Sequence, residues 1–257
     1  MLPRRQALFG GAVGVLSGSA CPCLAKTKPN RHDDIYGCML PDKEVQAFFR
    51  TAPDTRMFIT GDEPMIPRSG DKDFDLALAQ TLSLISDVLQ VTPGFAYYDD
   101  YDGLNAYATP RARLNGANGT VLFGQGMLAM LRGGQENPDV SVAAVCAHEF
   151  GHILQFRHGL TDQLQSGQST TKRAELQADF FAGYFAGVRK HQKPSFPAAV
   201  FAMTFYNFGD TDFSKPSHHG TSDERASALS HGFQSAFNDK RSLSEAIDIS
   251  MRYVMAL

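Results

Sequence analysis

The chain has 257 residues, of which 43% are hydrophobic and 20% are charged, and its formal net charge is −3. This composition is that of an ordinary globular protein with enough apolar residues for one sizeable core. The near-balanced charge, without a basic stripe, argues against a nucleic-acid-binding protein. The sequence also lacks the internal repeats, heptads and low-complexity tracts that would indicate a repeat or fibrous architecture.

The first 25 residues, MLPRRQALFGGAVGVLSGSACPCLA, follow the pattern of an export signal. A pair of arginines precedes an apolar run rich in glycine and alanine, and small residues come after it. The run is too short for a comfortable membrane span, which needs about 20 apolar residues. The stretch RRQALFGG also resembles a twin-arginine signal, a route that carries folded bacterial proteins. We therefore predict export to the bacterial periplasm, with residues 1–25 removed.

The small residues after the apolar run offer two cleavage points, after Ala25 or after Ala20. An uncleaved N-terminal anchor is the alternative to cleavage. Lipid attachment at Cys21 is disfavoured because Gly18 stands where such signals usually have a leucine. We expect any membrane association of the mature chain to be peripheral, and the sequence predicts no particular oligomeric state.

The remaining chain divides into an N-terminal arm, residues 26–70, and one domain, residues 71–257. The arm opens with the polar stretch KTKPNRHDDIYG, and no linker splits the domain. The domain opens with DKDFDLALAQTLSLISDVLQ, residues 71–90, whose apolar residues recur at helical spacing. Short strands bounded by Gly, Asp and Pro are expected within 91–100, 103–110 and 121–123, and a short helix is expected over 127–133.

A longer helix is predicted over residues 137–159, because both of its ends are marked. Asn137 can cap it, Pro138 suits its first turn, and Gly159 fits its stop. A polar loop, residues 161–171, separates it from a second helix over 172–190.

Small residues form a stripe on this second helix, at Ala178, Ala182 and Ala186, which would let another helix approach closely. Further helices are expected near 194–207 and from about Ser222 to the end of the chain. The predicted fold class is therefore α+β: a mostly helical single domain with a small sheet beside the 137–159 helix.

The helix over 137–159 contains HEFGH, residues 148–152. Four residues correspond to about 400° of helical rotation, so His148 and His152 lie one turn apart on one face and can bind a single Zn²⁺. Glu149 points about 100° away, beside such a metal, which suits a general base acting on water. Helical histidines that only form structural hydrogen bonds are the alternative.

A catalytic zinc needs a third protein ligand and an open position. Glu175 and Asp179, in AELQAD, are four residues apart and share a helix face. One carboxylate could bind zinc, and the other could accept the second N–H of a ligand histidine. A solvated acidic face balanced by Lys172 and Arg173 is the alternative, but the apolar FFAGYFAG that follows Asp179 indicates burial, and a buried carboxylate needs a partner.

Together these motifs resemble the gluzincin metallopeptidases of the HtpX and CAAX-prenyl-protease type, over about residues 71–232. Five stretches match in the family's order: NAYATP (105–110), TVLFGQGML (120–128), VAAVCAHEFGHILQF (142–156), ELQAD (175–179) and HHGTSDERASAL (218–229). The family members of the membrane type have several transmembrane helices, and the mature part of this chain has no such apolar stretch. The resemblance therefore points to a soluble, exported branch with a zincin-like fold.

The resemblance implies His148, His152 and Glu175 as ligands of one Zn²⁺, with Glu149 as the base. It implies that Asp179 does not bind the metal itself but contacts a residue that does. These roles come from matching this sequence to the family's H-E-x-x-H and E-x-x-x-D motifs, residue by residue.

The late segment resembles the family's H-P-x-x-x-x-R pattern, with His219 and Arg225 six residues apart. The resemblance implies that His219 stabilises the developing oxyanion and that Arg225 anchors the segment, against Asp179 or another buried acid. The neighbouring His218 is the alternative, although the spacing to Arg225 favours His219. Two surface histidines would be the simpler interpretation, and Gly220 departs from the proline that is common in the family.

The predicted function is that of a zinc metalloendopeptidase acting on polypeptides, specifically exported or misfolded envelope proteins. The substrate would lie extended along residues 105–110 or 120–123 by β-augmentation. A zinc-stabilised, chaperone-like protein that binds clients without cutting them is the alternative function, and a zinc hydrolase acting on a non-peptide bond is a third.

Two cysteines, Cys38 and Cys146, follow the predicted cleavage point. We expect two inert thiols. A disulfide between them and a Cys38 thiolate that binds zinc as a latch are the alternatives.

Overall fold

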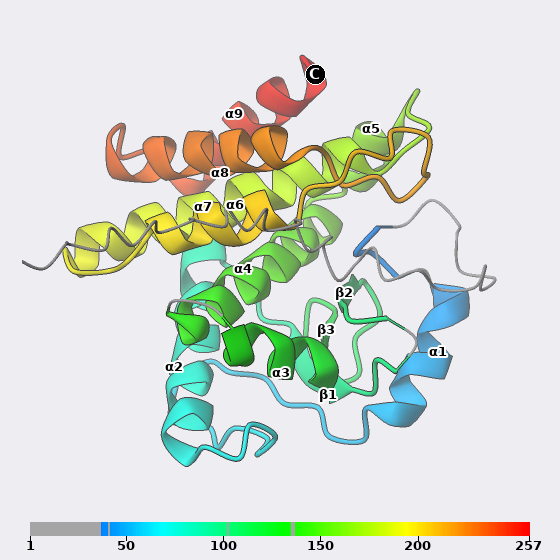
Figure 1. Ribbon diagram of the computed structural model, residues 1–257, viewed down its shortest axis with the longest axis vertical. Helices are drawn as coiled ribbons and strands as arrows, with labels where there is room; N and C mark the ends of the chain where they lie inside the picture. Colours follow the sequence, from blue (N-terminus) through cyan, green and yellow to red (C-terminus); the bar gives the residue numbers. More distant parts are fainter. Residues whose placement is uncertain (1–36, 41, 102, 135–136) are drawn as a thin grey trace, which may run out of the picture.

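The computed structural model describes residues 37–40, 42–101, 103–134 and 137–257 (Figure 1). The predicted export signal, residues 1–25, lies outside these ranges. The fold is α+β and mostly helical with a small sheet, as predicted. Its elements are α1 (Asp42–Thr51), α2 (Lys72–Leu89), β1 (Gly94–Tyr98), β2 (Ala106–Thr109), β3 (Thr120–Gly124), α3 (Gln125–Gly134), α4 (Pro138–Arg157), α5 (Thr161–Gln165), α6 (Lys172–Gln192), α7 (Ala199–Asn207), α8 (Ser222–Phe237) and α9 (Leu243–Met255).

The three strands form one sheet in the order β1-β3-β2. β1 runs parallel to β3, and β2 runs antiparallel to it. Alternate side chains point to opposite faces of a sheet, and here both faces are covered. One face joins the main core through Phe95, Tyr97, Ala106, Ala108, Val121 and Phe123. The other face, with Ala96, Tyr98 and Leu122, packs against Leu40, Val45 and Ala52.

Residues before α2 frame the sheet on both sides. Met39 pairs with Ala108 at the edge of β2, in parallel, and Arg56 pairs with Phe95 at the edge of β1. α1 lies between these two contacts, and its Val45 is fully buried. In Figure 1 this segment runs in blue around the sheet. Part of the stretch assigned to the N-terminal arm, residues 26–70, is thus packed into the folded domain.

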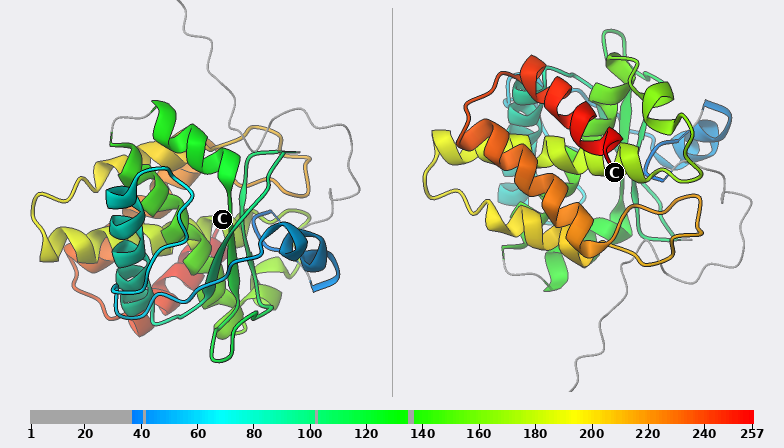
Figure 2. Two further views of the ribbon diagram at one scale, coloured as in Figure 1. Left: turned by 90° about the horizontal axis from the view of Figure 1, so that it is seen from below. Right: turned by 90° about the horizontal axis from the view of Figure 1, so that it is seen from above.

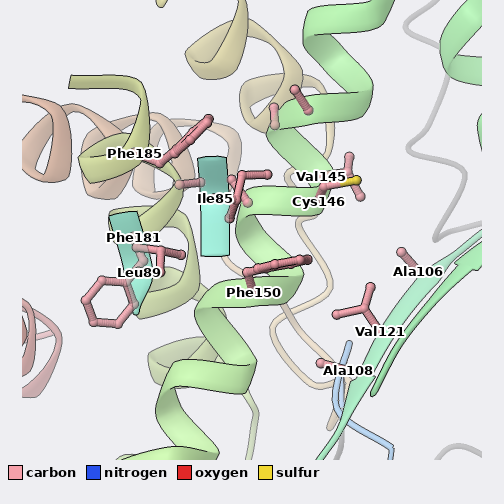
Figure 3. Packing of buried hydrophobic residues seen from close by; sticks show 14 of the residues in the cluster. Ile85, Leu89, Ala106, Ala108, Val121, Val145, Cys146, Phe150, Phe181 and Phe185 are labelled. Carbon is pink, nitrogen blue, oxygen red and sulfur yellow. The ribbon is translucent and has the colours of Figure 1, made fainter. Parts of the chain in front are cut away.

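α4, which carries HEFGH, lies at the centre of the molecule. It contacts α2, α3, α6, α7 and the sheet, and every residue from Ser141 to Gln155 is buried. Figure 3 shows Ala108 and Val121 of the sheet facing α4 from one side, while Ile85 and Leu89 of α2 approach from the other. Polar side chains on such a helix are removed from bulk water, so each of them needs a partner inside the protein.

α8 runs alongside α6, and α9 packs next to both (Figures 1 and 2). Glycines allow this close approach of α6 to α8, whereas Ala178 of the predicted alanine stripe allows α4 to approach α6. A Cβ added at Gly183 of α6 would lie 1.9 Å from the backbone oxygen of Leu229 on α8. Ala178 of that stripe instead faces α4, where a Cβ on Gly151 would come within 3.1 Å of the Ala178 Cα.

Several element boundaries differ from the prediction. The short helix α5 lies inside the loop expected over 161–171, and the last predicted helix is two helices, because α9 starts afresh at a capping box formed by Ser242 and Glu245. α7 begins at Ala199 rather than near 194. Asn137 precedes α4 in a left-handed conformation, and its side chain makes no capping hydrogen bond to the described residues. Within the described ranges, no helix is long and apolar enough to cross a membrane.

Candidate metal centre

Three of the predicted ligand atoms converge between α4 and α6. His148 Nε2 lies 3.1 Å from His152 Nε2 and 3.2 Å from Glu175 Oε2, and His152 Nε2 lies 3.7 Å from the same oxygen. Ligand atoms bound to one Zn²⁺ at about 2.0–2.1 Å in a tetrahedron lie about 3.3–3.4 Å apart. The observed separations bracket that value, so these three residues fit a single zinc-sized cation.

The ring orientation of His152 follows from the hydrogen bonds of Gln155. Gln155 Nε2 donates to the carbonyl oxygen of Ala174 at 2.8 Å, so its Oε1 is the atom that faces His152 Nδ1 at 2.9 Å. His152 Nδ1 is therefore the donor, and in the neutral ring Nε2 is left with a lone pair directed at the cluster. This is the tautomer that binds a metal through Nε2.

Asp179 orients the other histidine in the same way. His148 Nδ1 donates to Asp179 Oδ1 at 2.8 Å, as expected from the sequence, so the neutral ring also presents a lone pair at Nε2. The 3.1 Å contact between the two Nε2 atoms then requires a proton or a metal cation between them. Burial would lower the pKa of His148, but the hydrogen bonds and charges of Asp179 and Glu175 raise it to about 9.

Asp179 is held in turn by Arg225. Arg225 Nε and Nη2 each donate to the carboxylate at 2.8 Å, which is the predicted contact, and Arg225 Nη1 donates to the carbonyl oxygen of Phe208 at 3.3 Å. Burial opposes ionisation of Asp179, but the Arg225 charge and its hydrogen bonds lower the pKa of this carboxyl. The guanidinium of Arg225, on α8, is therefore buried next to Asp179, on the side of Asp179 away from the ligand atoms of His148 and Glu175.

Glu149 is buried beside the cluster. Its Oε2 has no hydrogen-bond partner in the part of the chain that the structure describes. Burial, together with the charge of Glu175, raises the pKa of Glu149 to about 8, although the His148 charge acts in the opposite direction. Three carboxyl groups, those of Glu149, Glu175 and Asp179, are buried together here, and Arg225 pairs with Asp179. A divalent cation at the centre would favour the ionised forms of Glu149 and Glu175.

Cys38 reaches the same centre from the N-terminal segment. A ligand atom of each of Cys38, His148, His152 and Glu175 lies within 4.8 Å of those of the other three, and all four residues are buried. The backbone N–H of Cys38 also donates to Glu175 Oε1 at 2.9 Å. Two imidazoles, a carboxylate and a thiol form a donor set that suits zinc. Cys38 and Cys146 are both free thiols, so the alternative of a disulfide between them is wrong.

His218 and His219 occupy different positions, and His219, which the spacing to Arg225 favours, is the one that lies near the ligand cluster. His219 Nε2 lies 3.7 Å from Cys38 Sγ, at the metal centre. His218 Nδ1 instead contacts Asp210 Oδ1 and packs against Phe213. Asp210 Oδ2 accepts a hydrogen bond from the backbone N–H of His219 at 3.0 Å, so this one carboxylate holds both histidines. Both are buried, and the surface interpretation is wrong.

Two residues of the site were missed from the sequence, Gln155 and Asp210. Gln155 follows His152 by three residues on the same helix face, which could have indicated a partner for that histidine. Asp210 lies in a polar loop, and nothing in its local sequence distinguishes it from the neighbouring Asp212. Comparison of the chain with protein-family models, with curated proteins and with solved structures found no match.

Proposed function

We propose that this protein is a zinc-dependent metalloendopeptidase that hydrolyses peptide bonds in polypeptide substrates. One observation carries the proposal: the converging ligand atoms of His148, His152 and Glu175, with a buried glutamate, Glu149, directly beside them. A site that only stabilised the fold would need the ligands but not an additional buried carboxylate. The presence of Glu149 therefore favours an enzyme over the non-cutting, chaperone-like alternative.

His148, His152 and Glu175 would hold a Zn²⁺, which would supply the Lewis acidity that makes a water molecule more acidic and polarises a carbonyl oxygen. Glu149 accepts the proton that the attacking water gives up and later donates it to the leaving amine nitrogen. His219 Nε2, already directed at the centre, donates a hydrogen bond to the substrate carbonyl oxygen as negative charge develops on it. Asp179 and Gln155 keep the ligand histidines in the required tautomer.

The family, the fold type and the cellular location belong to the same proposal. The ordered motifs support a zincin-like fold and membership among the HtpX and CAAX-prenyl-protease type of gluzincins. The pattern of residues 1–25 supports export to the periplasm, where misfolded envelope proteins would be the substrates. An extended polypeptide would add to the edge of β2, residues 106–109, because β3 is the middle strand and both of its sides are already paired.

The first test is casein cleavage by the purified full chain, in parallel with a chelator-treated sample and the Glu149→Gln variant. We expect Glu149→Gln to bind one equivalent of zinc and to keep the wild-type circular dichroism. Its cleavage rate should fall at least about 100-fold, because general acid–base catalysis contributes factors of about 10²–10⁴. Glu245→Gln, which changes an exposed glutamate on α9, is the matched control and should leave the rate unchanged.

Full activity in Glu149→Gln would contradict the assigned base. His148→Ala should lose both zinc and activity, which separates loss of the metal from loss of the base. A folded, zinc-loaded wild-type protein that cleaves no polypeptide, even after Cys38 is replaced, would favour the client-binding alternative.

A further inference from the structure

Three ligands and an open fourth position are the usual arrangement of a catalytic zinc, whereas four protein ligands close the site. Here a fourth donor is present. The Cys38 Sγ lies within 4.8 Å of the ligand atoms of His148, His152 and Glu175, close enough to take the fourth coordination position of a metal that these residues bind. The thiol also lies 3.7 Å from His219 Nε2, the proposed donor to the substrate oxygen.

The backbone around Cys38 occupies the proposed substrate edge as well. The N–H of Ala108 in β2 donates to the Cys38 carbonyl oxygen at 2.9 Å, and the N–H of Leu40 donates to the Ala108 carbonyl oxygen at 2.8 Å. Residues 38–40 are therefore paired with β2 in the manner of an added strand. A substrate that pairs with the same backbone groups has to displace them.

The side chains of residues 38–40 are buried. Met39 is buried in the main core, and Leu40 is buried in the smaller cluster beneath the sheet. Gly37 has a φ of +51°, and a Cβ there would lie 2.2 Å from Glu175 Oε1 and 2.8 Å from Thr171 Oγ1. Only glycine fits this position, because the backbone approaches the ligand carboxylate so closely.

We infer that residues 37–40, the latch segment, hold the enzyme in a latent form: Cys38 binds the metal as its fourth ligand while residues 38–40 occupy the edge of β2. The inference rests on the proposed function. Activation is the departure of this segment, which opens the fourth coordination position and the strand edge together. A permanent four-ligand structural site would have the same donors, but it would leave Glu149 without a task.

The first experiment uses Co²⁺ in place of zinc, because a thiolate bound to Co²⁺ gives a charge-transfer absorption that imidazole and carboxylate ligands do not. We expect the wild-type full chain and Cys146→Ser to bind one equivalent of Co²⁺ with this band. Cys38→Ser should bind one equivalent without it. Cys146 is the matched control, since it is equally buried but lies in the hydrophobic core. A Co²⁺-loaded wild type that lacks the band would overturn the inference and leave the proposed function intact.

The second experiment measures casein cleavage by the zinc-loaded forms of the same variants. If the latch keeps about nine-tenths of the molecules closed, its removal raises the rate about ten-fold. We expect this rise in Cys38→Ser, no change in Cys146→Ser, and loss of activity in the double variant Cys38→Ser/Glu149→Gln. A thiolate band in the wild type without any rise in Cys38→Ser would make Cys38 a permanent ligand and refute the latch. Failure of every variant to bind metal would instead refute the proposed function.

Discussion

Glu175 and Asp179 are one helical turn apart on α6, yet their carboxylates contact different groups. Glu175 directs Oε2 at the two histidine Nε2 atoms, and its Oε1 accepts the Cys38 N–H. Asp179 faces His148 Nδ1 and Arg225, so both of its oxygens are engaged by donors. The carboxylate opposite the guanidinium is thereby committed to charge pairing, and the other remains available to a cation.

A carboxylate far from the metal centre provides a test of pH-dependent stability. Glu63 accepts hydrogen bonds from the N–H groups of Ile59, Thr60 and Gly61, and these bonds lower its pKa from 4.5 to about 2. A carboxyl whose pKa is depressed by folding stabilises the folded state above its unfolded pKa. This stabilisation is present above about pH 4.5 and is lost as the pH falls to about 2.

We therefore expect Glu63→Gln to unfold at a lower urea concentration than wild type near neutral pH. The gap between the two midpoints should close as the pH falls from about 4.5 to about 2. Asp62→Asn, which removes the neighbouring exposed carboxylate, serves as the control. A gap between wild type and Glu63→Gln that stays constant across this pH window would contradict the assignment.

Spacing alone placed His148 and His152 on one helix face and Glu175 and Asp179 on another, because residues four apart on a helix share a face whatever the tertiary structure. Gln155 also follows this rule and could have been found. The choice of Glu175 as the third ligand came from the family resemblance. The approach of Cys38 to His219 joins residues 181 positions apart, and its contact with Glu175 spans 137 positions. Local periodicity carries no information on such distances, so the place of Cys38 depends on how the whole chain folds.

At the scale of elements, the crossing of α6 and α8 determines whether Arg225 reaches Asp179. Both helices carry glycine at the crossing: a Cβ on Gly183 would lie 1.9 Å from the Leu229 oxygen, and one on Gly232 would lie 1.8 Å from the Phe180 oxygen. These are backbone atoms, which cannot rotate away as the end of a side chain can. The helices can therefore approach this closely only while both positions lack side chains.

Gly183→Ala is expected to destabilise the protein by about 1–3 kcal/mol or more, because the added methyl group forces the helices apart. Gly133→Ala on α3 is the matched control: an added Cβ meets nothing within 4 Å among the described residues. Alanine should stabilise that position by about 0.4–1 kcal/mol through the reduced entropy of the unfolded chain. Urea unfolding of the two variants tests both signs, and equal stabilities would contradict the proposed steric role.

α2 was predictable from the helical spacing of its apolar residues, α4 from Pro138 and Gly159 near its ends, and the three strands from short runs bounded by turn residues. α1 carries Val45, Phe48 and Phe49 at helical spacing and could have been recognised within the supposed arm. α5 has only one buried residue, Leu164, and so offers no periodic signal. The side of β2 that residues 38–40 occupy could not be predicted, because strand pairing over such a separation is a property of the tertiary fold.

At the scale of the whole molecule, the ligand cluster joins three parts of the chain: α4, α6 and the segment before α1. A metal that binds only the folded state stabilises it by mass action, by about 4.1 kcal/mol at a free concentration 1,000 times its Kd. For a chain of this size that corresponds to a rise in Tm of about 8–16 °C.

Thermal unfolding of metal-free protein at increasing zinc concentrations measures this coupling. We expect the Tm of wild type to rise with zinc and to return to its starting value after chelation. His148→Ala should show a Tm that is independent of zinc. An unchanged wild-type Tm across the titration would count against a zinc site in the folded protein.

The position of α1 decides how a displaced latch segment behaves. α1 begins at Asp42, only two residues past Leu40, and its Val45 stays packed beneath the sheet. A released latch segment therefore stays tethered near the edge of β2, and its effective concentration at that edge is on the order of millimolar. Under the proposed function, an unfolded polypeptide would displace the latch segment only where its own local concentration and affinity exceed that value. Activity would then rise where unfolded chains accumulate and fall once they have been hydrolysed.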